Sequence, residues 1–311
     1  MRTLYFVFFA VSFFLAAIGG HAADTMTVTV QGPETPSDTR YDYDQAVVRL
    51  ALEKTTDSHG PFELKVTPVG FNSKRALTAT TNGTFENYLV KYSVHDDLID
   101  KVGIIPFPVD LGIVGYRVGF ASTQTKSKLA NLTSIEQLKK IEIIQGIGWL
   151  DTTILRHHDF NVRTGDDYNG MFRMVALNRS ELFLRGANEM LNEWKVHQGT
   201  PDLTFDETIA VYYPLPRFFV TTKENTALKE RIHKGLIEAY NDGSLIQLWE
   251  EKYLDSVDFV NLGARRIFRV SNPFLKRIDP SWEKYVYTAL QSEDTMPTND
   301  KELSNDSLYI D

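Results

Sequence analysis

The sequence contains no cysteine. This absence excludes disulfide bonds, thiolate metal sites, a cysteine nucleophile and a lipid anchor attached to a cysteine. A chain of 311 residues without disulfides must depend on its hydrophobic core for stability. Its length allows two lobes of ordinary size.

Motifs typical of several function classes are also missing. No basic block with interleaved aromatic residues occurs, so we expect no nucleic-acid partner. We find no Gly-x-Ser-x-Gly elbow, no Walker loop and no Gly-x-Gly-x-x-Gly turn. His157 and His158 are adjacent and lack the i, i+4 spacing that brings two metal ligands together on a helix. We therefore predict a protein that is not an enzyme and holds neither a cofactor nor a metal.

The first 22 residues have the pattern of a secretory signal peptide. Arg2 supplies the positive start, an apolar run follows, and small residues precede a cleavage site before Ala23. No later segment is long and apolar enough to span a bilayer. We expect a mature protein in the periplasm. The net charge of −8 is partly carried by an acidic C-terminal tail, for which we expect mobility at its end.

Residues 140–155 combine features that favour a ligand site. Isoleucines at 141, 143 and 144 predict a buried strand, Gly146 and Gly148 allow a tight turn, and Asp151 or Thr152 can cap a helix. A strand, a glycine turn and a helix start place free backbone N–H groups at the carboxyl edge of a sheet. An ordinary strand-to-helix connection without a ligand explains the same local pattern.

Strands alternate with helices along the chain, which predicts an α/β protein with mostly parallel sheets. We expect strands at residues 26–30, 62–69, 85–94, 110–122, 161–164, 181–184, 209–213 and 217–222. We expect helices at residues 41–54, 73–81, 168–177, 188–196, 225–240 and 244–253.

Five segments carry a resemblance to a known family. They are Tyr-Asp-Gln-Ala-Val-Val-Arg-Leu-Ala-Leu-Glu-Lys-Thr at 43–55, Gly-Tyr-Arg at 115–117, Gly-Ile-Gly-Trp-Leu-Asp-Thr at 146–152, Phe-Leu-Arg-Gly-Ala-Asn-Glu at 183–189 and Tyr-Pro-Leu-Pro-Arg-Phe-Phe-Val at 213–220. With the order of elements, they resemble type II periplasmic solute-binding proteins, specifically the extracellular family 3 group. The likeness covers about residues 26–273.

The resemblance implies two lobes, each a mixed, mostly parallel sheet flanked by helices, joined by two hinge crossovers. Lobe 1 would be discontinuous and lobe 2 inserted, with ligand held in the cleft between them. The implied division is a signal peptide at 1–22, lobe 1 at 23–117 plus 218–275, lobe 2 at 118–217 and an acidic extension at 276–311. The implied hinge residues are Tyr116, Arg117, Pro214, Pro216 and Arg217.

The sequence departs from the family where its amino-acid-binding members hold their ligand. Those members present an arginine for the ligand carboxylate in a Thr-x-x-Arg segment, but residues 93–97 contain none. Where they place an aspartate for the ligand amino group, this chain has Arg185. Replacing a carboxylate by a guanidinium reverses the charge preference of the site. We therefore expect a small polar and anionic or polyhydroxylated ligand, or a protein that has lost tight ligand binding.

Arg185 is the leading candidate for a ligand contact, and an ion pair with Glu189 is the alternative. Trp149 could stack on the ligand, whereas Asp151 is better explained as a helix cap. Glu189 and Glu193 are four residues apart, a spacing typical of solvated carboxylates. The candidate ligand-binding residues are Arg185, Trp149, Gly146, Asp151, Thr152, Glu34, Asp38, Tyr41 and Tyr213.

The function expected from these observations is non-catalytic capture of a small molecule by a monomer that presents it to an inner-membrane permease. A periplasmic sensor that presents its bound state to a membrane receptor fits the same fold. A hydrolase with Glu189 or Asp151 as acid or base is the third hypothesis. The sequence does not name the ligand.

Overall fold

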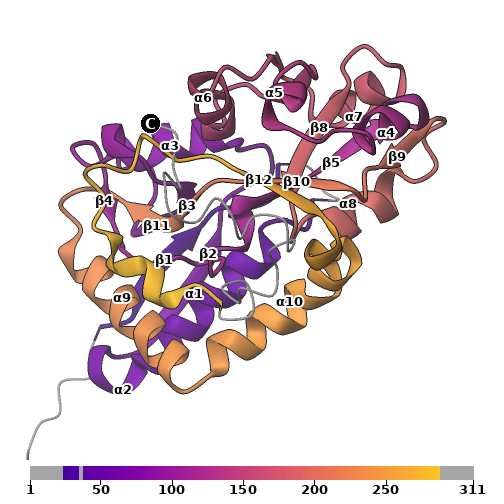
Figure 1. Cartoon of the computed structure of the whole chain (residues 1–311). Coiled ribbons are helices and arrows are strands. Elements are labelled where there is room, and N and C mark those ends of the chain that lie inside the picture. Colours follow the sequence, from indigo (N-terminus) through magenta and orange to yellow (C-terminus); the bar gives the residue numbers. More distant parts are fainter. Residues whose placement is uncertain (1–23, 35–37, 288–311) are drawn as a thin grey trace, which may run out of the picture.

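The computed structural model describes residues 24–34 and 38–287 and contains two β-sheets with helices packed around them (Figure 1). The predicted signal peptide and the tail beyond residue 287 lie outside the described residues. The predicted fold class, a two-lobed α/β protein, is confirmed.

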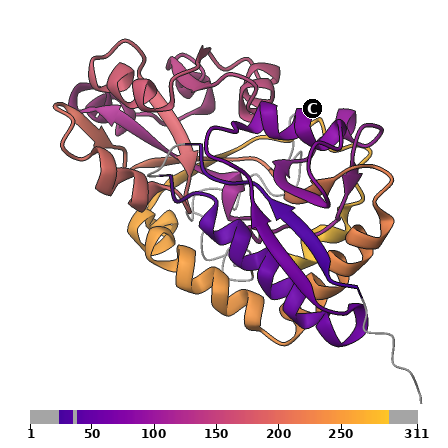
Figure 2. The ribbon, with the colours of Figure 1, turned by 180° about the vertical axis from the view of Figure 1, so that it is seen from behind.

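The first sheet combines strands from both ends of the chain. Its order is β2-β1-β3-β11-β4, with β1 parallel to β2 and β3, and β11 antiparallel to β3 and β4. In the view from behind, its indigo and violet strands lie in front (Figure 2). Its strands are β1 (Met26–Val30), β2 (Phe62–Val66), β3 (Tyr88–Ser93), β4 (Gly103–Ile104) and β11 (Arg217–Thr221).

The second sheet is built mainly from the middle of the chain. Its order is β12-β10-β5-β8-β6-β7, and β9 pairs with β5 off this path. Strand β5 is antiparallel to β8, β9 and β10, whereas β6 is parallel to β7 and β8. Its strands are β5 (Tyr116–Ser122), β6 (Ile143–Gly146), β7 (Val162–Gly165), β8 (Leu182–Gly186), β9 (Leu203–Phe205), β10 (Ile209–Tyr212) and β12 (Arg266–Arg269).

Helices α4 to α7 lie around the second sheet, whereas α1, α9 and α10 lie beside the first (Figure 1). The α-helices are α1 (Asp42–Lys54), α2 (Thr56–His59), α3 (Ser73–Thr81), α4 (Thr123–Leu129), α5 (Ile135–Leu138), α6 (Leu150–His157), α7 (Tyr168–Ala176), α8 (Met190–His197), α9 (Thr226–Asn241) and α10 (Ser244–Val260). The 3-10 helices are η1 (Asp96–Leu98), η2 (Ile113–Gly115), η3 (Leu262–Ala264) and η4 (Pro280–Tyr285). In the described part of the chain, no helix combines the length and apolarity needed to cross a bilayer.

The chain passes between the sheets at η2–β5 and again between β10 and β11. A further passage, not included in the sequence prediction, occurs at β12, which pairs in parallel with β10. The chain then returns to the first sheet, where Trp282 packs on Phe218 with ring centroids 6.3 Å apart. The expected strand at 110–122 begins only at Tyr116 because η2 interrupts it. The division of the chain into lobes at the residues given above stays a prediction.

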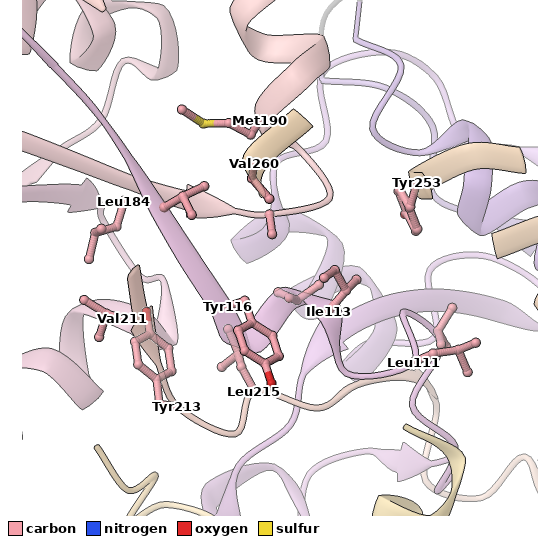
Figure 3. Close-up of a cluster of buried hydrophobic side chains, with 14 of the residues drawn as sticks. Leu111, Ile113, Tyr116, Leu184, Met190, Val211, Tyr213, Leu215, Tyr253 and Val260 are labelled. Carbon is pink, nitrogen blue, oxygen red and sulfur yellow. The ribbon is translucent and has the colours of Figure 1, made fainter. Parts of the chain in front are cut away.

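One cluster of buried hydrophobic side chains extends through both sheets. It contains Val28 of β1 and Phe120 of β5, neither of which is exposed. Figure 3 shows part of this cluster, with Tyr116 and Tyr213 close to Leu215. The two sheets therefore share a core, which fixes the elements that border the site.

Gly235 allows α9 to pack closely on α1. A Cβ at this position would lie 2.0 Å from the backbone oxygen of Ala51, which cannot move aside without shifting α1. We predict that Gly235→Ala lowers the free energy of unfolding by about 1–3 kcal/mol, although alanine favours a helix interior. Urea unfolding measures the change. Gly263→Ala, where a Cβ has open space, is the control and should be close to neutral. Equal stability of the two variants would contradict the close packing.

Candidate functional site

A cleft of about 940 Å³ is bordered by residues from both sheets. The first sheet and its loops contribute Asp38 and Lys91, and the second contributes Trp149 and Glu189. The candidate ligand-binding residues that line it are Glu34, Asp38, Tyr41, Trp149, Asp151, Thr152 and Arg185. The predicted hinge residues Arg117 and Arg217 line it as well. The cleft thus brings together side chains that are far apart in the sequence.

Other predicted residues lie next to the cleft lining without forming part of it: Gly146, Tyr213, Tyr116, Pro214 and Pro216. Gly146 has an indirect role, because a Cβ there would lie 2.3 Å from the indole of Trp149. The absence of a side chain at this position allows the Trp149 ring to fold back over the end of β6.

The helix that follows this turn differs from the prediction in its cap. Trp149, not Asp151 or Thr152, is the N-cap residue of α6, and no side chain caps the helix. Thr152 Oγ1 donates to the Gly146 carbonyl at 3.3 Å. The interpretation of Asp151 as a helix cap is therefore wrong, since Asp151 is in the first turn and bonds elsewhere.

Asp151 is the acceptor in a buried network with Arg117 and Tyr213. Arg117 donates from Nη2 to Asp151 Oδ1 and from Nε to the Tyr213 hydroxyl at 3.2 Å. The Tyr213 hydroxyl in turn donates to Asp151 at 2.6 Å. Burial would lower the pKa of Arg117, but the neighbouring Asp151 and Tyr213 raise it overall, so Arg117 is charged. The network connects β5, α6 and the β10–β11 crossover.

Arg185 lies inside β8, not after it, and is only 3% exposed. Its Nη2 is 2.6 Å from Glu193 and 3.0 Å from Glu189, and its Nε donates to Glu193 at 2.9 Å. Tyr168 also donates its hydroxyl to Glu193. The expectation that the two glutamates are solvated is wrong, because both pair with Arg185. The guanidinium also lies 4.8 Å from the centre of the Trp149 ring.

The environment of Glu189 favours its charged form. Burial would raise its pKa, but Arg185 and Arg117 outweigh this effect and lower the pKa to about 2. At neutral pH it is therefore a carboxylate that holds Arg185 and accepts from the Gly186 N–H at 3.0 Å. For Glu193, burial has the larger effect, and its pKa is raised although Arg185 is adjacent.

Asp38 and Glu34 hold Arg40, a residue that the sequence analysis did not single out. Arg40 pairs with Asp38 at 2.8 Å and with Glu34 at 3.4 Å, while Tyr41 donates to Glu34 at 2.9 Å. The Arg40 guanidinium lies 4.6 Å from the ring centre of Tyr168 in α7. This contact joins the loop before α1 to a helix of the second sheet.

A fourth charged cluster lies on the first-sheet side and was also missed. Lys91 is 2.5 Å from Asp44 and 2.8 Å from Asp110, and Tyr253 donates to Asp110 at 3.4 Å. Asp44 belongs to the same helix face as Val47, Val48 and Ala51. A carboxylate on an apolar helix face, together with a lysine in a buried strand, is a signal that could have identified the cluster.

Metal binding finds no support in the described residues, where no group of three or more histidine, aspartate or glutamate side chains could hold an ion. His158 lies 2.9 Å from the Ser271 carbonyl through Nε2, and His157 contacts the ring of Phe274. These two histidines connect α6 with the chain that follows β12.

No protein-family model matches the chain, and no curated protein matches it. Solved structures share its fold. An ancestral arginine-binding protein bound to arginine is 16% identical, with a TM-score of 0.54 over 73% of this chain and 98% of that one. An arginine-specific periplasmic binding protein of Salmonella typhimurium is 15% identical, with a TM-score of 0.54 over 74% of this chain and 100% of its own.

A third structure is an ancestral amino-acid-binding protein described as a precursor of cyclohexadienyl dehydratase. It is 14% identical, with a TM-score of 0.53 over 73% of this chain and 95% of its own. At such identities the comparisons establish the fold. The predicted resemblance to two-lobed, type II periplasmic binding proteins is confirmed at that level.

The Arg117–Asp151 pair should contribute strongly to stability. We predict that Asp151→Asn lowers the free energy of unfolding by roughly 3 kcal/mol, because Arg117 would be left buried without a carboxylate. Urea unfolding at pH 7 measures the loss. Asp167→Asn removes an exposed pair with Arg173 and should cost less than about 1 kcal/mol. A loss at Asp151 no larger than that at Asp167 would contradict this assignment.

The lowered pKa of Glu189 predicts a pH-dependent contribution to stability. A carboxyl group with a folded-state pKa of about 2 and an ordinary value of 4.5 stabilises the fold fully above pH 4.5. The contribution is lost as the pH falls through 2. The stability difference between the wild type and Glu189→Gln should be roughly 2–3 kcal/mol at pH 7 and about half that at pH 3.

Urea titrations at pH 7, 5 and 3 test this dependence. Glu207→Gln is the control, because Glu207 forms an exposed pair with Lys126. A difference for Glu189→Gln that stays constant from pH 7 to pH 3 would show that its pKa is not lowered.

Proposed function

We propose that this protein captures a small polar molecule between its two lobes, without catalysis, and presents it to a membrane transporter. The observation that carries the proposal is the cleft of about 940 Å³, bordered by polar and aromatic side chains from both sheets. A cavity of this size suits a metabolite-sized ligand. The fold is one in which the named neighbours bind amino acids.

The charges of the cleft favour a zwitterionic or uncharged polar ligand over a strongly anionic one. The sequence analysis expected an anionic ligand because it treated Arg185 as unpaired. In the structure, the Arg185 guanidinium is paired with Glu189 and Glu193. Arg40 and Arg117 are paired in the same way. An amino acid carries both charges and fits a cleft that is lined by both cations and anions.

A hydrolytic role is disfavoured by the state of the acidic side chains. Glu189 has a pKa of about 2 and would not serve as a general acid near neutral pH. Asp151 accepts from both Arg117 and Tyr213, so it does not face a substrate as a free base. We therefore assign the charged residues of the cleft to positioning and binding.

We further propose that the mature chain begins at Ala23 and works as a monomer in the periplasm with an ABC-type permease. The signal-peptide pattern of residues 1–22 supports export. A neighbour of the same fold is itself described as a periplasmic binding protein.

A thermal-shift screen tests the proposal directly. We expect L-arginine, L-glutamine or L-lysine at millimolar concentration to raise the unfolding temperature by several degrees, because a ligand that binds only the folded state stabilises it by mass action. Succinate, inorganic phosphate and glucose complete the panel. Absence of any shift, with absence of heat in calorimetry, would contradict solute capture by this cleft.

The same screen uses two variants. Trp149→Leu should weaken binding of the active compound about tenfold, because the indole borders the cleft. Leu177→Ser changes an exposed apolar residue outside the cleft lining and should leave binding unchanged.

A further inference from the structure

Three buried polar atoms of the cleft-lining residues make no hydrogen bond within the described part of the chain: Oδ1 of Asp44, Nε of Arg217 and Oδ1 of Asn188. Asp44 Oδ1 lies 2.5 Å from Lys91 Nζ, which leaves Arg217 Nε and Asn188 Oδ1 as the two atoms without a close partner. Buried polar atoms in folded proteins nearly always have a partner, so an unpaired atom in a cleft indicates a place for a ligand. Arg217 belongs to β11 of the first sheet, and Asn188 lies in the turn that follows β8 of the second.

Arg217 is less closely paired with carboxylates than Arg40, Arg117 and Arg185, which also line the cleft. Its nearest carboxylate oxygen belongs to Asp110 and lies 3.8 Å from Nε, beyond hydrogen-bond distance. Lys91 and Tyr253 bind the other oxygen of this carboxylate, Oδ1, so they hold the Asp110 side chain on their own side and leave Oδ2 without a hydrogen bond among the described residues. By contrast, Arg185 lies within 3.0 Å of two carboxylates. Arg217 is thus available for an additional anionic partner.

The backbone of Arg217 is held in the first sheet. Arg217 opens β11, pairs with Ser93 of β3, and its carbonyl accepts from the Val109 N–H at 2.9 Å. Burial would lower its pKa, but Asp110 and Asp44 raise it overall, so the group is charged. The charge of Arg217 also contributes to the lowered pKa of Glu189, and both residues line the cleft.

Asn188 is 4% exposed and lies in a crowded group around Gly186. A Cβ on Gly186 would be 2.5 Å from Asn188 Oδ1, 3.0 Å from Glu189 Oε2 and 3.2 Å from Arg117 Nη1. Glycine at this position therefore allows the three side chains to converge. Glu189 already accepts from Arg185 and from the Gly186 N–H. Asn188 Oδ1 accepts no hydrogen bond within the described residues and can accept one from a ligand.

We infer that Arg217 binds the carboxylate of the ligand and that Asn188 Oδ1 accepts a hydrogen bond from its amino or amide N–H group. The inference rests on the proposed solute capture and specifies its chemistry: a carboxylate and an N–H donor on one small molecule. Arg217 thus takes the role of binding the anionic group of the ligand, which the sequence analysis gave to Arg185. Because the two contacts come from different sheets, one ligand connects both sides of the cleft.

Pairs of probes that differ only in the carboxylate test the role of Arg217. The pairs are L-arginine with agmatine and L-lysine with cadaverine, measured by calorimetry on the full mature chain. We expect the wild type to bind the amino acid about a hundredfold more tightly than its decarboxylated partner, since a charge-assisted pair is lost. In Arg217→Gln this ratio should fall below about fivefold, because the affinity for the amine stays unchanged.

Arg269→Gln is the matched control, because Arg269 is an exposed arginine outside the cleft lining, and it should keep the wild-type ratio. Arg217→Gln should remain folded and unfold at a slightly lower temperature than the wild type, since it loses the 3.8 Å ion pair with Asp110. Asn188→Leu should weaken both members of each pair equally, by about tenfold, because both carry the amino group.

The outcomes separate the inference from the function on which it rests. A wild type that binds an amino acid, with an Arg217→Gln variant that retains the hundredfold ratio, overturns the inference alone. If a folded Arg185→Lys variant loses the hundredfold preference for the amino acid over its decarboxylated partner and Arg217→Gln keeps it, Arg185 is the residue that binds the carboxylate. A wild type that binds neither member of either pair, and no amino acid of the thermal-shift panel, contradicts amino-acid capture, and the inference fails with it.

Discussion

An ionised side chain can be buried only where a partner of opposite charge replaces the water it loses. The cleft of this protein meets that requirement repeatedly. Arg117 pairs with Asp151, Arg185 with Glu189 and Glu193, and Lys91 with Asp44 and Asp110. These pairs tie α6, α8 and α1 to the strands at the cleft. Within the described part of the chain, Arg217 has no carboxylate oxygen at hydrogen-bond distance, and its guanidinium can therefore contact a ligand.

The fold could be predicted because it follows from patterns within single segments. Alternating strands and helices fixed the class, and the glycines after β6 indicated the turn that places Trp149 at the cleft. Of the charge pairs, the sequence offered only that of Arg185 with Glu189, as an alternative to a ligand contact. The others could not be predicted, because Arg185 and Glu193, for example, meet only once α8 has packed beside β8. Asp151 illustrates the limit: its position after a turn favours a helix cap, but the buried Arg117 of a distant strand takes its carboxylate.

The cleft is already bordered by contacts between its two sides. Arg40 reaches the ring of Tyr168, and the chain after β12 contacts α6 through Ser271 and His158. The shared hydrophobic core adds to these contacts. Motion of one sheet against the other must therefore break the cation–π contact of Arg40 with Tyr168. It must also move the segment that follows β12 relative to α6. Opening of the cleft thus depends on interactions that can be identified.

The pairing of β3 with β11 has a consequence for how the chain acquires its structure. Ser93 lies opposite Arg217, and nearly the whole second sheet is encoded between them. While the polypeptide is synthesised, strands β5 to β10 can associate before β11 emerges, but the inner edge of β3 stays uncovered until then. An uncovered edge strand invites pairing with other chains, and contacts this distant in sequence form slowly. The early part of the nascent chain is therefore where a chaperone that shields strand edges would matter most.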